Sequence, residues 1–344
     1  MGKNNQIRRI CIVPNVSGVG GMVSFREKLV KGLAERRIGV SYDLADSPYE
    51  AILVIGGTRD LAGLWRAKRR GVRIVQRLDG MNWIHHKRQT GWRHFLRAEY
   101  GNLILSLIRS RLADQIIYQS HFSHQWWERV YGLNQIPWHV VHNGVDLERY
   151  TPDGSGDLPG DHVRILLVEG TIGGGYEFGL QTAIQMGEKL HSSYSHEVEV
   201  MVVGRVSTAL QREWNNRTEI IMNFTGQLAG EKIPEIDRSA HVLFAADLNP
   251  ACPNSVIEAL ACGLPVAGFD TGALCEIITE GSGQLVPYGG DPWKLEPPNI
   301  AGIAKAVNDI LISQPGYRKN ARKRAEEAFG LDHMVEGYLK VLIP

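Results

Sequence analysis

The sequence predicts an α/β fold made of two tandem domains, each with its own Rossmann-like parallel sheet. The chain has 344 residues, and single cores stop growing at about 250–300 residues. Its 43% hydrophobic and 22% charged residues are typical of globular proteins. Strand and helix patterns alternate in both halves, and a polar segment separates the halves. Together these observations favour two α/β domains.

In the first half, short runs rich in β-branched residues predict buried strands at residues 9–13, 51–55, 72–75 and 115–118. Between the first two strands, four apolar residues fall on one helical face: Met22, Phe25, Leu29 and Leu33. This spacing predicts an amphipathic crossover helix, and a strand, helix and strand in that order form a parallel βαβ unit.

The second half repeats this pattern. It predicts a strand at 164–168, an amphipathic helix that carries Leu180 and Leu190, and a strand at 197–203. Residues 151–160 are rich in Gly, Pro and Asp, which is typical of a linker. We therefore expect domains at 1–150 and 151–330. Open parallel sheets bind ligands at the carboxyl ends of their strands, so the functional loops should face a cleft between the domains.

A glycine loop follows the first strand and contains Gly18, Gly20 and Gly21. A loop of this kind that opens a helix can present backbone N–H groups to a phosphate, although it can equally be a tight turn. A dinucleotide fingerprint fits less well, because Val23 stands at its third glycine even though Asp43 could bind a ribose. The sequence has no GK[ST] motif of a P-loop.

Residues 250–266 are the most informative stretch. Pro253, Asn254 and Ser255 are favourable residues for a helix start, and Gly263 is favourable for its end. Glu258 lies one turn into this short helix, where a carboxylate could accept hydrogen bonds from ribose hydroxyls while the helix N-terminus takes phosphates. The alternative is an ordinary surface glutamate.

The chain resembles the family 4 retaining glycosyltransferases in three places: the run 254–266 with Gly272 and Glu276 beyond it, the segment 140–152 with Asn143, and the loop with Gly20 and Gly21. The resemblance implies the GT-B fold, with an acceptor-binding domain at 1–150 and a donor-binding domain at 151–330. In this family the last helix returns to the first domain, which implies that 331–344 belongs there.

The resemblance also implies roles for single residues. Gly20 and Gly21 would approach the diphosphate of a nucleotide-sugar donor, Glu258 would hold its ribose, and the backbone of three residues would bind its phosphates: Asn254, Ser255 and Val256. Family chemistry retains the anomeric configuration without a protein nucleophile. We therefore expect no cofactor and no required metal, with the donor as a substrate and leaving-group charge met by helix dipoles and cations.

The sequence departs from the family pattern in its donor domain. Pro250 stands where the family has a second glutamate, and Asp247 is a candidate replacement. Residues 169–177 contain none of the cations that usually bind the diphosphate, which leaves Arg205 as the nearest substitute.

In the first domain, Asp79 replaces a histidine that the family has near the reacting sugar, and it is the candidate catalytic residue. His85 and His86 lie close by in the sequence, where a solvated loop pair is the alternative to catalysis.

Charge is divided unevenly along the chain. Residues 1–150 carry a net charge of +11 and the remainder −10, with basic clusters at 66–73 and 87–111 that include Trp65, Trp92 and Phe95. These clusters suggest a solvated surface, a docking face for the second domain, or binding to an anionic membrane or acceptor. We expect a glycan or lipid-linked acceptor and no nucleic acid partner.

The sequence contains no signal peptide or membrane span, so we expect a cytoplasmic protein, peripheral at the inner membrane face if the basic clusters bind lipid. The four cysteines should be buried reduced thiols. Three alternatives to a transferase remain: a GT-B-fold epimerase, a phosphorylase, and a non-catalytic partner subunit that binds a sugar nucleotide.

Overall fold

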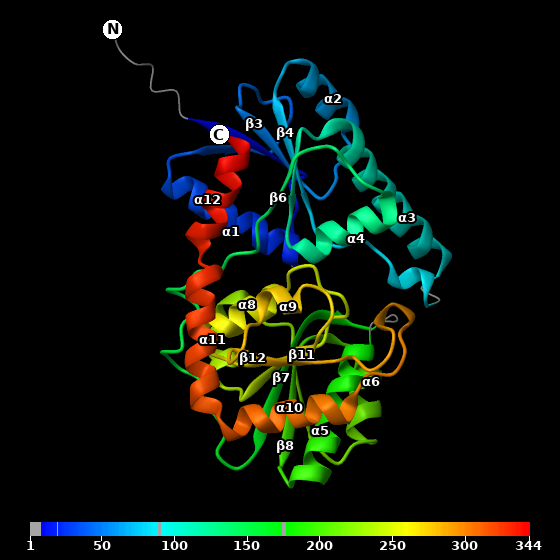
Figure 1. The fold of residues 1–344 in the computed structure, drawn as a ribbon, viewed down its shortest axis with the longest axis vertical. Helices are drawn as coiled ribbons and strands as arrows, with labels where there is room; N and C mark the ends of the chain where they lie inside the picture. Colours follow the sequence, from blue (N-terminus) through cyan, green and yellow to red (C-terminus); the bar gives the residue numbers. More distant parts are fainter. Residues whose placement is uncertain (1–7, 19, 89–90, 174–176) are drawn as a thin grey trace. The chain divides into compact units, whose positions relative to one another are not determined.

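The computed structural model describes residues 8–18, 20–88, 91–173 and 177–344. The chain divides into two compact units. The first holds the described residues up to His86, then Gly91–Gly144 and Leu331–Pro344, and the second holds Val145–Gly330 together with Lys87 and Arg88. Figure 1 shows both units, each with helices around a central sheet.

Within the described residues, the first unit contains a six-stranded parallel sheet in the order β2-β1-β3-β4-β5-β6. Its strands are β1 (Arg9–Val13), β2 (Gly39–Ser41), β3 (Ala51–Ile55), β4 (Arg73–Leu78), β5 (Gln115–Tyr118) and β6 (Trp138–Val140). Its helices are α1 (Gly21–Glu35), α2 (Leu61–Arg69), the 3₁₀ turn η1 (Ile84–His86), α3 (Trp92–Leu107), the π-helical turn η2 (Ile108–Leu112), α4 (His121–Tyr131) and α12 (Leu331–Leu342).

Helix α12 comes last in the chain but packs on α1 in the first unit, where Figure 1 shows the red helix beside the blue one. The rings of Phe25 and Tyr338 pack at a tilt of 48° with centroids 5.0 Å apart. Gly32 permits the close approach, because a Cβ there would lie 2.4 Å from Val335 Cγ2. Arg36 donates hydrogen bonds of 2.7 Å to both Asp332 and Glu336. Burial of this apolar face fixes the end of the chain to the first unit.

The second unit has its own six-stranded parallel sheet, in the order β12-β11-β10-β7-β8-β9 over the described residues. Its strands are β7 (Val163–Ile172), β8 (Val198–Val206), β9 (Ile221–Gly226), β10 (Val242–Ala245), β11 (Val266–Phe269) and β12 (Gly283–Val286). Its helices are α5 (Phe178–Tyr194), α6 (Thr208–Asn215), η3 (Gly230–Lys232), α7 (Ile233–Arg238), α8 (Asn254–Ala261), α9 (Leu274–Ile277), η4 (Pro292–Lys294), α10 (Ile300–Ile312) and α11 (Gln314–Ala328).

These two sheets confirm the predicted fold class of tandem Rossmann-like domains. The strands predicted at 9–13, 51–55 and 115–118 are observed with the same bounds. Strand β7 differs, because it continues past the predicted end at Val168 to Ile172 through an irregularity in its register with β8. Glu169 therefore lies in a strand and not in a loop.

The segment 151–160, predicted as an interdomain linker, lies inside the second unit. Arg238 explains this difference, since its side chain donates hydrogen bonds to the carbonyl oxygens of Thr151 (3.0 Å) and Ser155 (2.6 Å). The division between the units falls between Gly144 and Val145, six residues before the predicted boundary.

Two further sequence expectations concern the cysteines and membrane spans. Cys11, Cys252 and Cys262 are buried free thiols, as expected, but Cys275 is exposed. It lies in the four-residue helix α9, whose buried side chains are those of Leu274 and Ile277, and it faces solvent between them. No helix in the described part of the chain combines the length and apolar character needed to cross a bilayer.

Candidate active-site residues in each unit

The carboxyl edge of the second sheet contains most of the predicted donor-binding residues. The order of the strands reverses between β7 and β10, because the chain passes from β7 to β8 on one side and places β10 on the other. Loops diverge at such a switch point and leave a crevice at the carboxyl ends of the strands, which is where open α/β sheets bind ligands.

Helix α8 begins at this edge with an N-terminus that no side chain caps. Its N-cap, Pro253, makes no side-chain capping hydrogen bond, and the first turn has no acidic residue. Asn254 and Ser255 are partly exposed, whereas Val256 is buried. The first N–H groups of a helix have no partner within the helix, and the helix dipole favours an anion beside them. This end of α8 is therefore suited to a phosphate.

Glu258 lies one turn into α8 and is partly exposed. Asp237 and Tyr150 are near enough to interact with it electrostatically and are almost completely buried. Burial, reinforced by the charge of Glu258, raises the pKa of Asp237 well above its usual range and also raises the pKa of the Tyr150 phenol. Asp237 and Tyr150 therefore ionise less readily beside Glu258 than they would in water.

The turn before α8 is fixed by close backbone contacts. A Cβ on Gly272, whose φ is +60°, would lie 2.4 Å from the ring of Pro250, and Ala273 N donates a hydrogen bond of 2.8 Å to Pro250 O. Asn249 adopts a positive φ of 57°. The buried atoms Asn249 Nδ2 and Thr271 Oγ1 have no hydrogen-bond partner among the described residues. These two atoms are candidate ligand contacts that the sequence analysis missed.

Two carboxylates lie near the carboxyl ends of neighbouring strands at the switch point: Glu169 inside the last part of β7, and Asp247 just after β10. The surrounding protein and the like charge of Asp247 raise the pKa of Glu169 to about 8. Desolvation by the surrounding protein raises the pKa of Asp247 to about 6, although its side chain keeps access to solvent. The pair therefore holds a proton near neutral pH.

Arg205, the expected substitute for the missing cations, lies inside β8 and not after it. It pairs with Thr171 in the register between β7 and β8. Its side chain is exposed, and its Nη2 donates a hydrogen bond of 3.1 Å to Gln227 Oε1. Gly174, Gly175 and Tyr176 of the 169–177 segment lie outside the described residues.

In the first unit, Gly20 and Gly21 lie where β1 leads into α1. Gly20 is the N-cap of α1, with a φ of 147° that disfavours other residues, and a Cβ there would meet no atom within 4 Å. Arg26 holds the loop, since its guanidinium donates hydrogen bonds to Asn15 Oδ1 (2.7 Å) and to Val16 O. Val19 of this loop lies outside the described residues.

Asp79 follows β4, and its backbone position is fixed by α4. Trp127 Nε1 donates a hydrogen bond of 2.7 Å to Asp79 O, and a Cβ on Gly80 would lie 2.6 Å from the ring of Trp126. Gly80 is thus needed for this close packing. Burial raises the pKa of the Asp79 carboxyl, and the positive charge of Arg77 partly opposes this rise. A carboxylate with a raised pKa is a stronger base.

Asn143, part of the segment that resembles the family, has a structural role. Its Oδ1 accepts a hydrogen bond of 3.0 Å from Arg77 Nη2, and its Nδ2 donates one of 3.2 Å to Gln119 Oε1. Arg77 also lies 3.8 Å from the ring centroid of Phe25. All three polar residues are buried, so this network pairs polar groups below the carboxyl edge of the first sheet, although Arg77 Nε has no hydrogen-bond partner among the described residues.

His85 and His86 form a cluster with Glu99 of α3, and they are not the solvated pair that the sequence suggested. His85 is buried, and both imidazoles approach Glu99 Oε1, at 2.7 Å and 3.1 Å. Sequence spacing gave no signal for this cluster, because α3 brings Glu99 back from thirteen residues beyond His86.

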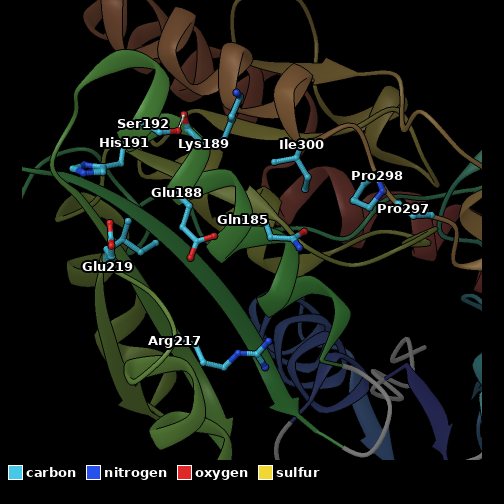
Figure 2. Close-up of a pocket in the computed structure, with 11 residues that line it drawn as sticks. Gln185, Glu188, Lys189, His191, Ser192, Arg217, Glu219, Pro297, Pro298 and Ile300 are labelled. Carbon is cyan, nitrogen blue, oxygen red and sulfur yellow. Dashed lines mark hydrogen bonds between the residues drawn. The ribbon is translucent and has the colours of Figure 1, made fainter.

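A groove of about 740 Å³ on the second unit lies away from these residues (Figure 2). Its walls come from the last turns of α5, including Gln185 and Glu188, from residues 217–220 before β9, and from residues 297–300. The end of α5 and residues 217–220 mark the amino edge of the sheet, whereas residues 297–300 follow β12 and lead into α10. No predicted site residue lines this groove.

Two family models match the chain. Residues 164–312 match the model described as Glycosyl transferases group 1. Residues 56–149 match the model described as Glycosyltransferase Family 4. The chain belongs to the group 1/family 4 glycosyltransferases, as the sequence motifs predicted.

Solved structures show the same fold. The chain superposes on a sucrose-phosphate synthase from Thermosynechococcus elongatus with a TM-score of 0.71, at 17% identity over 97% of this chain and 98% of that one. Anabaena HepE, solved with UDP-glucose, gives a TM-score of 0.69 at 16% identity over 97% and 99% of the two chains. These similarities confirm the GT-B fold.

Similarity to a curated protein is more limited in extent. A 2-deoxystreptamine N-acetyl-D-glucosaminyltransferase from Streptomyces fradiae is 25% identical over 107 residues, which span 31% of this chain and 24% of that protein. The match covers about a quarter of the relative's length.

Because the pKa values of Glu169 and Asp247 are raised, the free energy of unfolding should depend on pH. Folding raises the pKa of Glu169 from 4.5 to about 8, so its contribution to the free energy of unfolding is fully present below pH 4.5 and is lost as the pH rises through 8. Glu169→Gln should avoid this loss and stabilise the protein at pH 9 by on the order of 2 kcal/mol, with little effect at pH 4.5. Thermal unfolding across this pH range measures the difference.

Glu197→Gln is the matched control, because Glu197 is an exposed residue at the amino edge of the same sheet. An equal shift in both variants, or a shift that does not depend on pH, would contradict the assignment of a protonated pair.

Proposed function

We propose that the protein is a retaining glycosyltransferase that moves a sugar from a nucleoside-diphosphate sugar to a glycan, lipid-linked or small-molecule acceptor. The observation that carries this proposal is α8, whose uncapped N-terminus lies at the carboxyl edge of the second sheet with Glu258 one turn behind it. Family membership supports the same reaction class.

In this proposal the second unit binds the donor. The N–H groups of Asn254, Ser255 and Val256 receive the diphosphate, and the Glu258 carboxylate accepts hydrogen bonds from ribose hydroxyls. Arg205 supplies a positive charge at the same edge of the sheet. Gly20 and Gly21 of the first unit remain proposed diphosphate contacts. UDP is the first nucleotide to test, because it is the one in the HepE complex.

The proposed chemistry needs neither a cofactor nor a metal at the phosphates. The departing diphosphate carries the charge that develops as the sugar leaves, and helix N-termini aimed at it stabilise that charge without reorganisation. Asp79, with its raised pKa, orients or deprotonates the acceptor hydroxyl. Retention of the anomeric configuration follows if the acceptor attacks from the face that the diphosphate leaves.

Nucleotide binding and turnover test this function. Thermal shift with UDP, GDP, ADP and CMP sugars should identify one preferred base, because ligand at 100 times its Kd stabilises by about 2.7 kcal/mol. Glu258→Gln should weaken that binding about 10- to 150-fold, as expected for the loss of charged hydrogen bonds worth about 1.5–3 kcal/mol. Isothermal titration measures the change.

Glu197→Gln, at the opposite edge of the sheet, should bind the nucleotide like the wild type. Unchanged affinity in Glu258→Gln would remove Glu258 from the site. Binding of a sugar nucleotide with no transfer to any acceptor, and no epimerised or phosphorolysed product, would favour a non-catalytic partner subunit, a function consistent with Pro250 at the position of the family's second glutamate.

Asp79→Asn should lower kcat by about 100-fold or more and leave the donor KM nearly unchanged, because general base catalysis contributes about 10²–10⁴ in rate. Steady-state kinetics with the preferred donor measures both constants. Glu35→Gln serves as the control, since Glu35 is an exposed residue at the far end of α1. Equal kcat values in Asp79→Asn and wild type would exclude the catalytic role.

The first unit also has a surface that fits an anionic membrane. Helix α3 exposes an apolar stripe, defined as Trp92, Phe95, Leu96, Tyr100, Leu103 and Leu107, with exposed fractions of 39–69%. These residues recur every three or four positions and therefore share one face of the helix. Arg93 and Arg97 of the same helix are exposed. Arginines beside exposed aromatic and leucine side chains suit a headgroup surface.

Fewer basic side chains of the 87–111 cluster reach the surface than the sequence suggested. Arg109 is buried, where its Nε donates a hydrogen bond of 2.9 Å to the Tyr118 hydroxyl. On α2, Arg66, Arg69 and Trp65 are exposed and extend the basic, aromatic character of the unit. We propose that these residues hold the protein reversibly at the inner membrane face, close to a lipid-linked acceptor.

Vesicle co-sedimentation tests this association. The protein should sediment with anionic vesicles at low salt, should sediment much less with neutral ones, and should be released at about 1 M NaCl, where the Debye length is about 3 Å. Leu103→Glu in the apolar stripe should reduce binding several-fold, whereas Ile312→Glu, at a residue of α10 that is 75% exposed, should not. Equal binding to neutral vesicles, or an equal loss in both variants, would contradict the proposal.

A further inference from the structure

Three potential metal ligands meet in the first unit, between η1 and α3. His85 Nε2, His86 Nε2 and Glu99 Oε1 all lie within 4.8 Å of one another. Glu99 Oε1 is 2.7 Å from the first nitrogen and 3.1 Å from the second. In the described part of the chain, no other group of three His, Cys, Asp or Glu side chains converges in this way.

The surroundings of the cluster hold one ligand rigidly and leave two adjustable. The His85 side chain is 1% exposed, against 50% for His86 and 43% for Glu99. Phe95 packs its ring edge-on against both imidazoles, with centroids 5.1 Å and 5.6 Å away.

We propose that His85, His86 and Glu99 bind a zinc ion through two imidazole nitrogens and one carboxylate oxygen. Two nitrogens and one oxygen are a donor set that Zn²⁺ accepts at about 2.0–2.2 Å, with water in the remaining position. Tetrahedral bonds of that length separate the ligand atoms by about 3.3–3.5 Å. Glu99 Oε1 must move away from His85 by roughly 0.6 Å, which its half-exposed side chain permits.

A bound zinc ion would join η1 to α3. Without it, the two elements meet here through the ring contacts of Phe95 and through hydrogen bonds to a single oxygen of the half-exposed Glu99. With it, the coordinate bond from Glu99 would tie the part of α3 next to Leu96, Tyr100 and Leu103 of the apolar stripe to an ion that both histidines also hold. The ion thus positions a surface helix and is separate from the chemistry proposed at the donor phosphates.

Zinc binding to the whole chain tests the proposal. After removal of metal with a chelator and dialysis, the protein should take one Zn²⁺ per chain in competition with a chromophoric chelator. Cobalt(II) in its place should give the intense visible absorption of a tetrahedral site. His86→Ala and Glu99→Gln should each weaken zinc binding by about 100-fold or more, because the loss of an outer-shell partner alone typically costs about 10- to 100-fold. Both residues are exposed enough to be replaced without loss of the fold.

His139→Ala is the matched control, because His139 is an exposed histidine of the same unit. It should bind zinc like the wild type. Absence of stoichiometric zinc in the wild type would overturn the proposal, as would equal zinc affinity in His86→Ala, Glu99→Gln and His139→Ala. The latter result would mean that other histidines bind the ion.

Discussion

The burial of both faces of each parallel sheet is the constraint on which the rest of this structure depends. Strands such as Ala51–Ile55 are buried at every residue, so helices must cover both faces. The crossover connections then return the chain to the same edge each time, and every strand ends where its neighbours end. Glu169 meets Asp247 at such an edge because of the topology, although no local sequence pattern joins the two residues.

Buried charge is handled differently in the two units. Arg77 keeps its charge below the first sheet's carboxyl edge, because Asn143 accepts its hydrogen bond and the Phe25 ring faces its guanidinium. In the second unit, Asp237 avoids the cost of a buried charge through a raised pKa. The first unit thus holds a fixed positive charge beside Asp79, whereas the second unit raises the pKa of the buried Asp237 beside Glu258.

Periodicity was sufficient to predict the fold class, and it located β1, β3 and β5 to the residue, because fully buried β-branched runs are distinctive. It was not sufficient for β7, whose continuation through Glu169 depends on an irregular register with β8. Periodicity also could not predict the cluster of His85, His86 and Glu99. Their convergence depends on the angle at which α3 packs, and residue spacing carries no information about that angle.

Phosphate binding at the carboxyl edge of the second sheet depends on residues that differ from the family pattern, among them Glu169. A glutamate at position 169 would repel a diphosphate if it were ionised, yet its proximity to Asp247 and its desolvation raise its pKa to about 8. The pair therefore contributes less negative charge at neutral pH than two free carboxylates would. With no cation in the described part of 169–177, the dipole of α8 and the charge of Arg205 become the main electrostatic attraction for a phosphate at this edge. Donor affinity should then fall as the pH rises and Glu169 ionises, whereas a site whose acidic neighbours are already charged would show no such fall.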